Sequence, residues 1–187
     1  MPHADQSKWD NRYRDADSAP RAALVLSENL HLLPTQGKAL DLACGLGGNA
    51  LLLAQQGLEV EAWDISPVAI EKLTKQATGL SIQTKVVDIT AESLPVGEFD
   101  VIVVSYFLDR RLAPAIIRAL RPNGLLFYQT FNQRLLGRGP SNPAWRLQDK
   151  ELLSLFAPLS LRYYREDSLD EEHALADEAM LVAQKRG

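Results

Sequence analysis

The sequence contains little cysteine, few aromatic residues and no long hydrophobic run. Cys44 is the only cysteine in 187 residues, so no intramolecular disulfide can form and nothing indicates an oxidising compartment. No stretch approaches the roughly 20 apolar residues that a membrane-spanning helix needs. The first fifteen residues are polar and charged, unlike the apolar centre of a signal peptide. These absences predict a cytoplasmic protein with no membrane partner.

The sequence also lacks an excess of basic residues. Asp and Glu number 24 and Lys and Arg 20, which gives a net charge of −4. Proteins that bind nucleic acids non-specifically neutralise phosphates with clustered basic residues, so we expect no nucleic-acid partner. The length fits one domain with a buried core. We predict a single domain over residues 1–187, with residues 1–33 as an N-terminal helical cap and residues 38–187 as the core.

Short apolar runs alternate with segments of helical periodicity, which is typical of an α/β fold with a mostly parallel sheet. The expected strands are 39–43, 59–64, 81–88, 99–105 and 125–131, with a final pair at 159–165 and 179–185. The expected helices are 22–33, 48–56, one that begins at Ser66-Pro67, 113–120 and 149–156. Residues 132–147 are rich in Gly, Pro, Asn and Arg and are expected to form a long surface loop. The acidic stretch 166–178 reads as a solvated connection between the last two strands.

A glycine-rich turn follows the first predicted strand. Glycine permits positive φ and lets a ligand approach the backbone closely. Asp41 lies just before these glycines, where its charge would repel a pyrophosphate but favour a cationic, amine-bearing nucleoside. An alternative is a nicotinamide-dependent reductase, because Gly45-Leu-Gly-Gly-Asn-Ala50 also fits the pattern G-x-G-x-x-G/A. The position of Asp41 and the lack of room for a separate substrate domain favour the first interpretation.

Three further groups follow the ends of predicted strands, where open α/β sheets bind their ligands. Asp64 ends the second strand, at the distance from the glycines where an acidic side chain accepts ribose hydroxyls. Asp88 and Ile89 follow the third strand, where a carboxylate and the next backbone N–H would read an adenine edge. Ser105 and Tyr106 follow the fourth strand, near the point where the strand order reverses.

Together these segments resemble the class I S-adenosylmethionine-dependent methyltransferases. Asp41-Leu-Ala-Cys-Gly-Leu-Gly47, Trp63-Asp64-Ile65-Ser66, Val87-Asp88-Ile89 and Leu120-Arg-Pro-Asn-Gly-Leu125 carry the likeness, which extends over residues 9–184. The last segment has Asn123 where the family usually has glycine, and asparagine also tolerates left-handed backbone. The resemblance implies a Rossmann-like seven-stranded sheet of order 3-2-1-4-5-7-6, with strand 7 antiparallel and helices on both faces. It also implies S-adenosyl-L-methionine as the cofactor and S-adenosyl-L-homocysteine as its product.

The resemblance also assigns donor-binding residues by their positions in these motifs. They are Asp41, Ala43, Cys44, Gly45, Gly47, Asn49, Asp64, Ile65, Asp88, Ile89, Ser105 and Tyr106. Cys44 is expected to contribute through its backbone rather than as a nucleophile. No metal site is expected.

A narrower likeness involves the N-terminus and the fifth strand. Trp9-Asp-Asn-Arg-Tyr13, Gln129-Thr-Phe-Asn132 and Gly139-Pro-Ser-Asn-Pro143 resemble small bacterial methyltransferases of the tellurite-resistance and thiopurine branch. In that branch an N-terminal segment with a Trp/Tyr pair folds over the cofactor, which adds Trp9 and Tyr13 to the donor-binding set; alternatively they form a hydrophobic latch. Tellurite enzymes also carry a His and an Arg near the last strands. His173 matches the first, but no arginine follows until Arg186, which argues against tellurite itself.

The candidate acceptor-binding residues are Phe107, Arg134, Arg138 and His173. The loop arginines, Arg146 included, could instead be solvated surface charge. Ser105-Tyr106-Phe107-Leu108 offers no obvious acid–base pair, and it lacks the Asn/Asp-Pro-Pro-aromatic pattern of enzymes that methylate nucleic-acid bases.

The sequence therefore favours methyl transfer to a small molecule, and first to a soft nucleophile such as a thiol, selenium or tellurium species. A soft nucleophile needs alignment and exclusion of water more than a general base. Two alternatives stay open. One is transfer to an oxygen or nitrogen of a small metabolite, assisted by Tyr106, His173 or a loop arginine; the other is a non-catalytic module that only binds the cofactor. A monomer or homodimer is expected.

Overall fold

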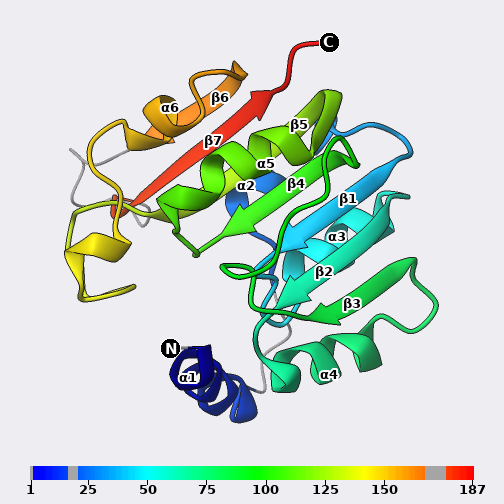
Figure 1. The fold of residues 1–187 in the computed structure, drawn as a ribbon, viewed down its shortest axis with the longest axis vertical. Helices are drawn as coiled ribbons and strands as arrows, with labels where there is room; N and C mark the ends of the chain where they lie inside the picture. The colour runs from blue at the N-terminus through cyan, green and yellow to red at the C-terminus, as the bar shows by residue number, and fades with distance from the viewer. Residues whose placement is uncertain (1, 17–20, 167–175) are drawn as a thin grey trace.

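The computed structural model describes residues 2–16, 21–166 and 176–187, which form a seven-stranded sheet with helices on both faces (Figure 1). The strand order is β3-β2-β1-β4-β5-β7-β6, and β7 is antiparallel to both of its neighbours. The remaining pairs are parallel. The strands are β1 (Lys38–Leu42), β2 (Glu59–Asp64), β3 (Ile82–Val86), β4 (Phe99–Ser105), β5 (Leu120–Phe131), β6 (Ser160–Glu166) and β7 (Glu178–Gln184). The predicted fold class, strand order and antiparallel seventh strand are confirmed.

Two hydrophobic cores lie on opposite faces of the sheet because successive residues of a strand point to opposite sides. Leu40 and Leu42 belong to the core under α5 (Ala113–Ala119) and α6 (Glu151–Leu155). Ala39 belongs to the other core, with α2 (Leu24–Ser27), α3 (Gly48–Gln55) and α4 (Pro67–Gln76). Figure 1 shows α5 in front of β4 and β5, and α2 and α3 behind the sheet.

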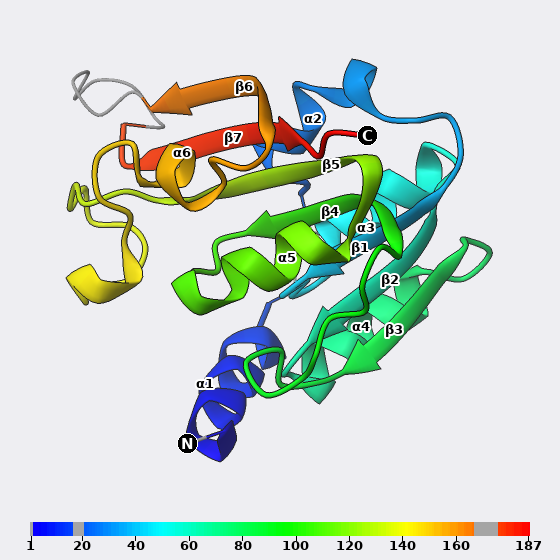
Figure 2. The same ribbon diagram turned by 45° about the horizontal axis from the view of Figure 1, so that its top comes forward.

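Helix α1 (Pro2–Arg14) stands apart from these two layers and lies against α4 at the end of the sheet (Figure 2). Helix α4 begins as the sequence predicts: the Ser66 hydroxyl accepts the Ala69 N–H at 3.2 Å, and Pro67 occupies the first turn. Within the described residues, none of the helices has the length and apolar character needed to cross a bilayer.

Several predicted boundaries were wrong. The helix expected at 22–33 is only α2 followed by the 3₁₀ turn η1 (Leu30–Leu32). It stops because the buried Asn29 side chain donates to the Val25 carbonyl at 3.0 Å, and such local bonds compete with the helix. Strand β5 begins at Leu120 rather than at 125, and its irregular register with β4 accommodates Asn123 at φ 65°.

The other differences are short. Strand β3 and helix α6 are shorter than predicted. Two further 3₁₀ turns were not predicted: η2 (Arg110–Leu112) precedes α5, and η3 (Pro143–Trp145) lies within the loop predicted at 132–147.

Candidate functional site

The turn between β1 and α3 is built on residues with left-handed backbone. Ala43, Gly45 and Gly47 have φ values of 59°, 52° and 82°. A Cβ on Gly47 would lie 2.2 Å from the Leu73 side chain, and one on Gly45 would lie 2.8 Å from the Tyr13 hydroxyl. Both glycines are therefore required by conformation and by space.

Asp64, the last residue of β2, holds this turn from the neighbouring strand. One carboxylate oxygen accepts the Gly45 N–H at 2.8 Å and the other accepts the Ser66 N–H at 2.9 Å. The residue is 5% exposed. Burial raises the pKa of Asp64, and the backbone hydrogen bonds from Ser66, Gly45 and Ile65 oppose that shift. The predicted partners Asp64 and Gly45 thus lie together, with the half-buried Ile65 beside them.

Asp41 lies beneath the turn and is fully buried. Its carboxylate accepts the Ala50 N–H at 3.0 Å and the Asn49 side-chain amide at 3.3 Å. Burial raises the pKa of Asp41 to about 7, against the effect of these two hydrogen bonds. The structure therefore gives Asp41 two hydrogen-bond donors at the start of α3.

Asn49 connects three segments of the site. Besides its bond to Asp41, it donates to the Ser105 hydroxyl at 2.9 Å and accepts the Ala23 N–H at 2.8 Å. The turn, the end of β4 and the chain entering α2 are thereby fixed to one another. Cys44 is buried in the same turn, and burial raises the pKa of its thiol, which agrees with a backbone role.

Helix α1 places an aromatic pair beside the turn. The Tyr13 hydroxyl lies against Gly45, and the Tyr13 ring stacks on Trp9 with 5.7 Å between ring centroids. Burial raises the pKa of Tyr13, and the charge of Asp64 adds to this. Tyr13 is thus next to the glycine turn, and Trp9 reaches it through Tyr13; their contact with a donor stays a prediction.

Reciprocal contacts at the helix ends join α1 to α4. Asp10 accepts the Ser66 hydroxyl hydrogen bond at the start of α4 and, at 3.5 Å, the Val68 N–H. Lys72 of α4 donates to the carbonyl oxygens of Tyr13 and Arg14 at 2.7 and 2.9 Å. A carboxylate at a helix N-terminus and a cation at a helix C-terminus are both favourable, so these contacts hold α1 beside the turn.

Asp88 and Ile89 lie after β3, on the other side of Asp64. The Asp88 carboxylate accepts the Thr90 N–H at 3.0 Å and the Thr90 hydroxyl at 2.7 Å, which closes the turn. Ile89 is 6% exposed and packs in the core. The side chain of Asp88 therefore has a structural partner in addition to the predicted adenine contact.

Tyr106 follows β4 and has the unusual φ of 55° for a bulky residue. Its N–H donates to the Gln129 carbonyl at 2.8 Å, and its ring lies 5.2 Å from that of Phe131. Its hydroxyl donates to Glu178 at 3.2 Å and accepts from the Gln129 amide at 3.0 Å. Burial, followed by the charge of Glu178, raises the pKa of Tyr106.

Sequence reasoning missed two acidic residues in this part of the site. Asp177 and Glu178 were expected in a solvated connection, but they are 0% and 2% exposed. Arg138 contacts both carboxylates, and its bond to Glu178 is 3.1 Å. Their burial could not be read from the sequence, because the surrounding stretch is acidic and polar. His173 lies outside the described residues.

The structure also gives contacts for Arg146, Arg134 and Phe107. Arg146 is neither surface charge nor an open anion site: it is 1% exposed and donates to the carbonyls of Pro140, Asn132, Arg134 and Arg138. Arg134 is half-buried, and its N–H donates to the Asn132 side chain at 2.9 Å. Phe107 packs against the core, and its carbonyl accepts the Tyr128 hydroxyl at 2.8 Å.

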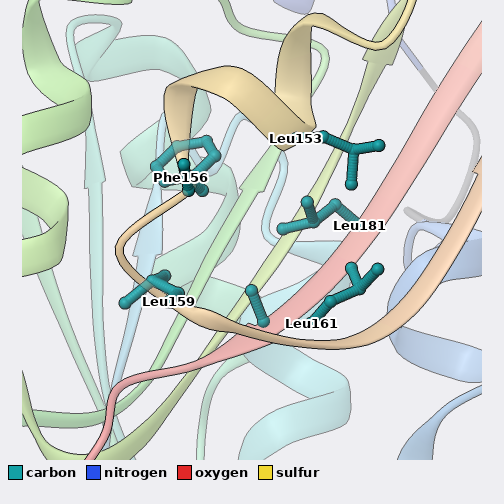
Figure 3. A pocket seen from close by; sticks show the side chains of 7 residues that line it. Leu153, Phe156, Leu159, Leu161 and Leu181 are labelled. Carbon is teal, nitrogen blue, oxygen red and sulfur yellow. The ribbon is translucent and has the colours of Figure 1, made fainter.

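A shallow apolar hollow of about 180 Å³ lies beneath α6, away from this site (Figure 3). Its lining comes from α6, β6, β7 and the segment between α6 and β6, and it includes none of the residues predicted for the donor or acceptor. The lining residues are Leu153, Phe156, Ala157, Leu159, Leu161, Leu181 and Ala183. All of these side chains are hydrocarbons, so the hollow offers a charged nucleoside no polar side chain.

Comparison with known proteins shows which protein family the chain matches. Residues 12–170 match a family described as a methyltransferase domain. A curated relative, the probable S-adenosyl-L-methionine-dependent methyltransferase TehB of Haemophilus influenzae, is 38% identical over 89 residues, which are 45% of this chain and 31% of TehB. The ubiquinone biosynthesis O-methyltransferase of Xanthomonas axonopodis is 28% identical over 172 residues, 83% of this chain and 69% of that protein. The chain thus spans about a third of TehB.

Solved structures agree on the fold. The crystal structure of TehB from Haemophilus influenzae aligns with a TM-score of 0.71 at 22% identity, covering 96% of this chain and 67% of that one. Geranyl diphosphate C-methyltransferase from Streptomyces coelicolor A3(2), in complex with Mg²⁺, geranyl diphosphate and S-adenosyl-L-homocysteine, aligns with a TM-score of 0.73 at 13% identity. That alignment covers 98% of this chain and 97% of that one.

Proposed function

The chain belongs to the class I S-adenosylmethionine-dependent methyltransferases, and on this premise we propose that it transfers a methyl group from S-adenosyl-L-methionine to a small molecule. The proposal rests on the turn 43–47 with its left-handed backbone. Asp64 accepts a hydrogen bond from this turn, and α1 lies beside it. In this arrangement Asp64 would accept the ribose hydroxyls, because a carboxylate has lone pairs left after accepting one N–H at each oxygen.

The other predicted donor-binding residues surround this centre. We propose that Asp88 and Ile89 hold the adenine, that the backbone of 43–47 approaches the amino-acid part, and that Trp9 and Tyr13 cover the donor from α1. When bound, the cofactor supplies an electrophilic methyl group on a sulfonium. The protein's residues then orient the acceptor and exclude water.

A soft nucleophile, meaning a thiol, selenium or tellurium species, is one candidate acceptor. The resemblance of residues 9–13, 129–132 and 139–143 to the tellurite-resistance and thiopurine branch supports it. From the sequence, the segment after the fourth strand was expected to lack an acid–base pair. The Tyr106 hydroxyl nevertheless lies within hydrogen-bond distance of Glu178, so the absence of a base does not favour this class.

A hydroxyl or amine of a small metabolite is the second candidate. The Tyr106–Glu178 pair favours it, because removal of a proton assists methyl transfer to these groups. The likeness to ubiquinone biosynthesis O-methyltransferase over 83% of the chain supports the same class.

Two measurements test the proposal. Titration calorimetry should show S-adenosyl-L-homocysteine binding at micromolar strength and no binding of nicotinamide dinucleotides; the reverse would refute it. Radiolabelled donor should then be tested against thiols, selenite, tellurite, phenols and amines. Binding without turnover across this panel would favour a non-catalytic module.

A further inference from the structure

Glu178 is a buried carboxylate at the edge of the sheet where the donor site lies. Strand β7 runs antiparallel, so its first residue pairs with Phe131, the last residue of β5. Parallel strands of this sheet end at the same edge, and ligands of open α/β sheets bind there. The residue is 2% exposed, and a buried charge needs partners.

Three side chains among the described residues donate to the Glu178 carboxylate. Gln129 donates to its Oε2 at 2.5 Å, and Arg138 donates to its Oε1 at 3.1 Å. The Tyr106 hydroxyl is 3.2 Å from Oε2. Of the polar groups that contact this carboxylate, the Gln129 amide is buried and Arg138 is shared with Asp177. The phenol of the half-exposed Tyr106 is the one that can pass a proton.

The surroundings of Tyr106 fix the direction of its hydroxyl bonds. The Gln129 amide donates to the phenol oxygen at 3.0 Å, so the phenol hydrogen is left for Glu178. A phenol oxygen has two lone pairs. One accepts from Gln129, and the other is left for a proton donor on the exposed side.

We infer that Tyr106 is a catalytic residue that takes the proton of a hydroxyl or amine acceptor, and that Glu178 is a positioning residue that receives the proton of Tyr106. The inference rests on the proposed function and selects its second acceptor class. The acceptor oxygen or nitrogen forms a bond to the methyl carbon, and the carbon–sulfur bond breaks with its electron pair going to sulfur. The acceptor proton goes to the Tyr106 oxygen as the Tyr106 proton goes to Glu178.

The charges around the pair suit this transfer. The charged groups that face it among the described residues are Arg138 and, through Arg138, Asp177. When Glu178 takes up a proton, Asp177 still neutralises Arg138, so no cation is left unpaired. The site therefore accepts the proton without creating an isolated buried charge.

The test uses Tyr106→Phe, which keeps the ring, and Glu178→Gln, which keeps the size but removes the charge and replaces one acceptor oxygen with a donor. Tyr163→Phe is the matched control, because the Tyr163 hydroxyl also contacts a glutamate, Glu28, at 3.4 Å on the surface. Turnover is measured with phenol and amine acceptors and, in parallel, with thiols. Tyr106→Phe should lower kcat about a hundredfold or more for the phenols and amines, the usual contribution of general acid–base catalysis. The thiol rates should fall much less, because a thiolate acceptor has no proton to give up.

Glu178→Gln should lower kcat for phenols and amines more than for thiols, because the proton of Tyr106 then has no carboxylate to receive it, and Glu178→Asp should restore part of the lost rate. A readout independent of turnover is absorbance titration of the tyrosines. The Tyr106→Phe titration identifies the signal of Tyr106 by its absence. In Glu178→Gln this signal should appear at lower pH than in the wild type, because a negative neighbour has been removed.

Cofactor binding separates this inference from the proposed function. If the wild-type protein does not bind S-adenosyl-L-homocysteine in calorimetry, the proposed function fails. If it binds and Tyr106→Phe matches the wild type on phenols and amines, the inference is overturned. Turnover confined to thiols, or no turnover of any acceptor by donor-binding protein, overturns it as well.

Discussion

Replacing Asp64 with alanine tests whether this carboxylate both holds the glycine turn and binds the donor. The substitution leaves the N–H groups of Gly45 and Ser66 without their acceptor. A hydrogen bond contributes about 1 kcal/mol net, so the loss of both should lower the free energy of unfolding by about 2 kcal/mol. For a protein of this size that corresponds to a fall in Tm of about 4–8 °C.

Besides lowering the stability, the same substitution should weaken the binding of S-adenosyl-L-homocysteine. A hydrogen bond to a charged group contributes about 1.5–3 kcal/mol. One such bond to a ribose hydroxyl corresponds to an affinity loss of about 10- to 100-fold, since 1.4 kcal/mol is tenfold. Thermal unfolding with and without the ligand, together with titration calorimetry, measures the two effects separately.

Asp100→Ala is the matched control for this experiment. Asp100 also accepts a backbone N–H, that of Lys38 at 2.8 Å, and it pairs with Arg121. It lies at the start of β4, at the end of the strand away from Ser105. Its replacement should lower Tm without changing the affinity for the ligand. If Asp64→Ala lowers Tm and binds the ligand as tightly as the wild type, Asp64 anchors the turn and does not contact the donor. If neither quantity changes, the hydrogen-bond reasoning is wrong.

Three further substitutions, of Arg146, Lys72 and Asp41, test other contacts of the structure. Arg146→Lys should lower the free energy of unfolding by about 3 kcal/mol, because a lysine cannot reach the carbonyls that the guanidinium joins; an unchanged melting curve would contradict this. Lys72→Met should release α1, increase tryptic cleavage within it and raise the Kd for S-adenosyl-L-homocysteine about three- to tenfold, the effect of losing about 1 kcal/mol. Lys75→Met on the same helix, which removes only the exposed pair with Glu71, should change neither. Burial raises the pKa of Asp41 to about 7. The native state therefore binds the carboxyl proton of Asp41 more tightly than the unfolded chain does. Its ionisation lowers the free energy of unfolding as the pH rises from about 4 to about 7. The Tm of Asp41→Asn minus that of the wild type should therefore increase between pH 5 and 8, and a constant difference in a melting series would show that Asp41 does not titrate there.

Local patterns predicted the strands and the donor side of the site. The alternation of apolar residues is a consequence of strand geometry, and the class I resemblance supplied the strand order. Asp64 was identifiable because its distance from the glycines in the sequence reflects one β-turn-α unit. The helix expected at 22–33 failed for an equally local reason that periodicity does not show, because the Asn29 side chain bonds to the Val25 carbonyl.

Arg146 shows where composition misleads. An arginine in a loop rich in glycine and proline is expected at the surface, because burial of an unpaired charge is costly. The structure meets that cost with backbone carbonyls from the loop itself. These acceptors exist at every residue of every sequence, so no side-chain pattern marks them.

The acceptor side depends on contacts between distant segments, and this explains why the sequence indicated the donor more clearly than the acceptor. Gln129 and Glu178 are 49 residues apart and meet only because β7 enters the sheet antiparallel beside β5. A shift of one residue in that register would turn Glu178 to the opposite face of the sheet, and Tyr106 would lose its carboxylate. On the roles proposed for Tyr106 and Glu178, the acceptor class would depend on strand register rather than on a motif. A relative that keeps the glycine turn but has no carboxylate at the start of β7 should bind the same donor and methylate groups that need no proton acceptor.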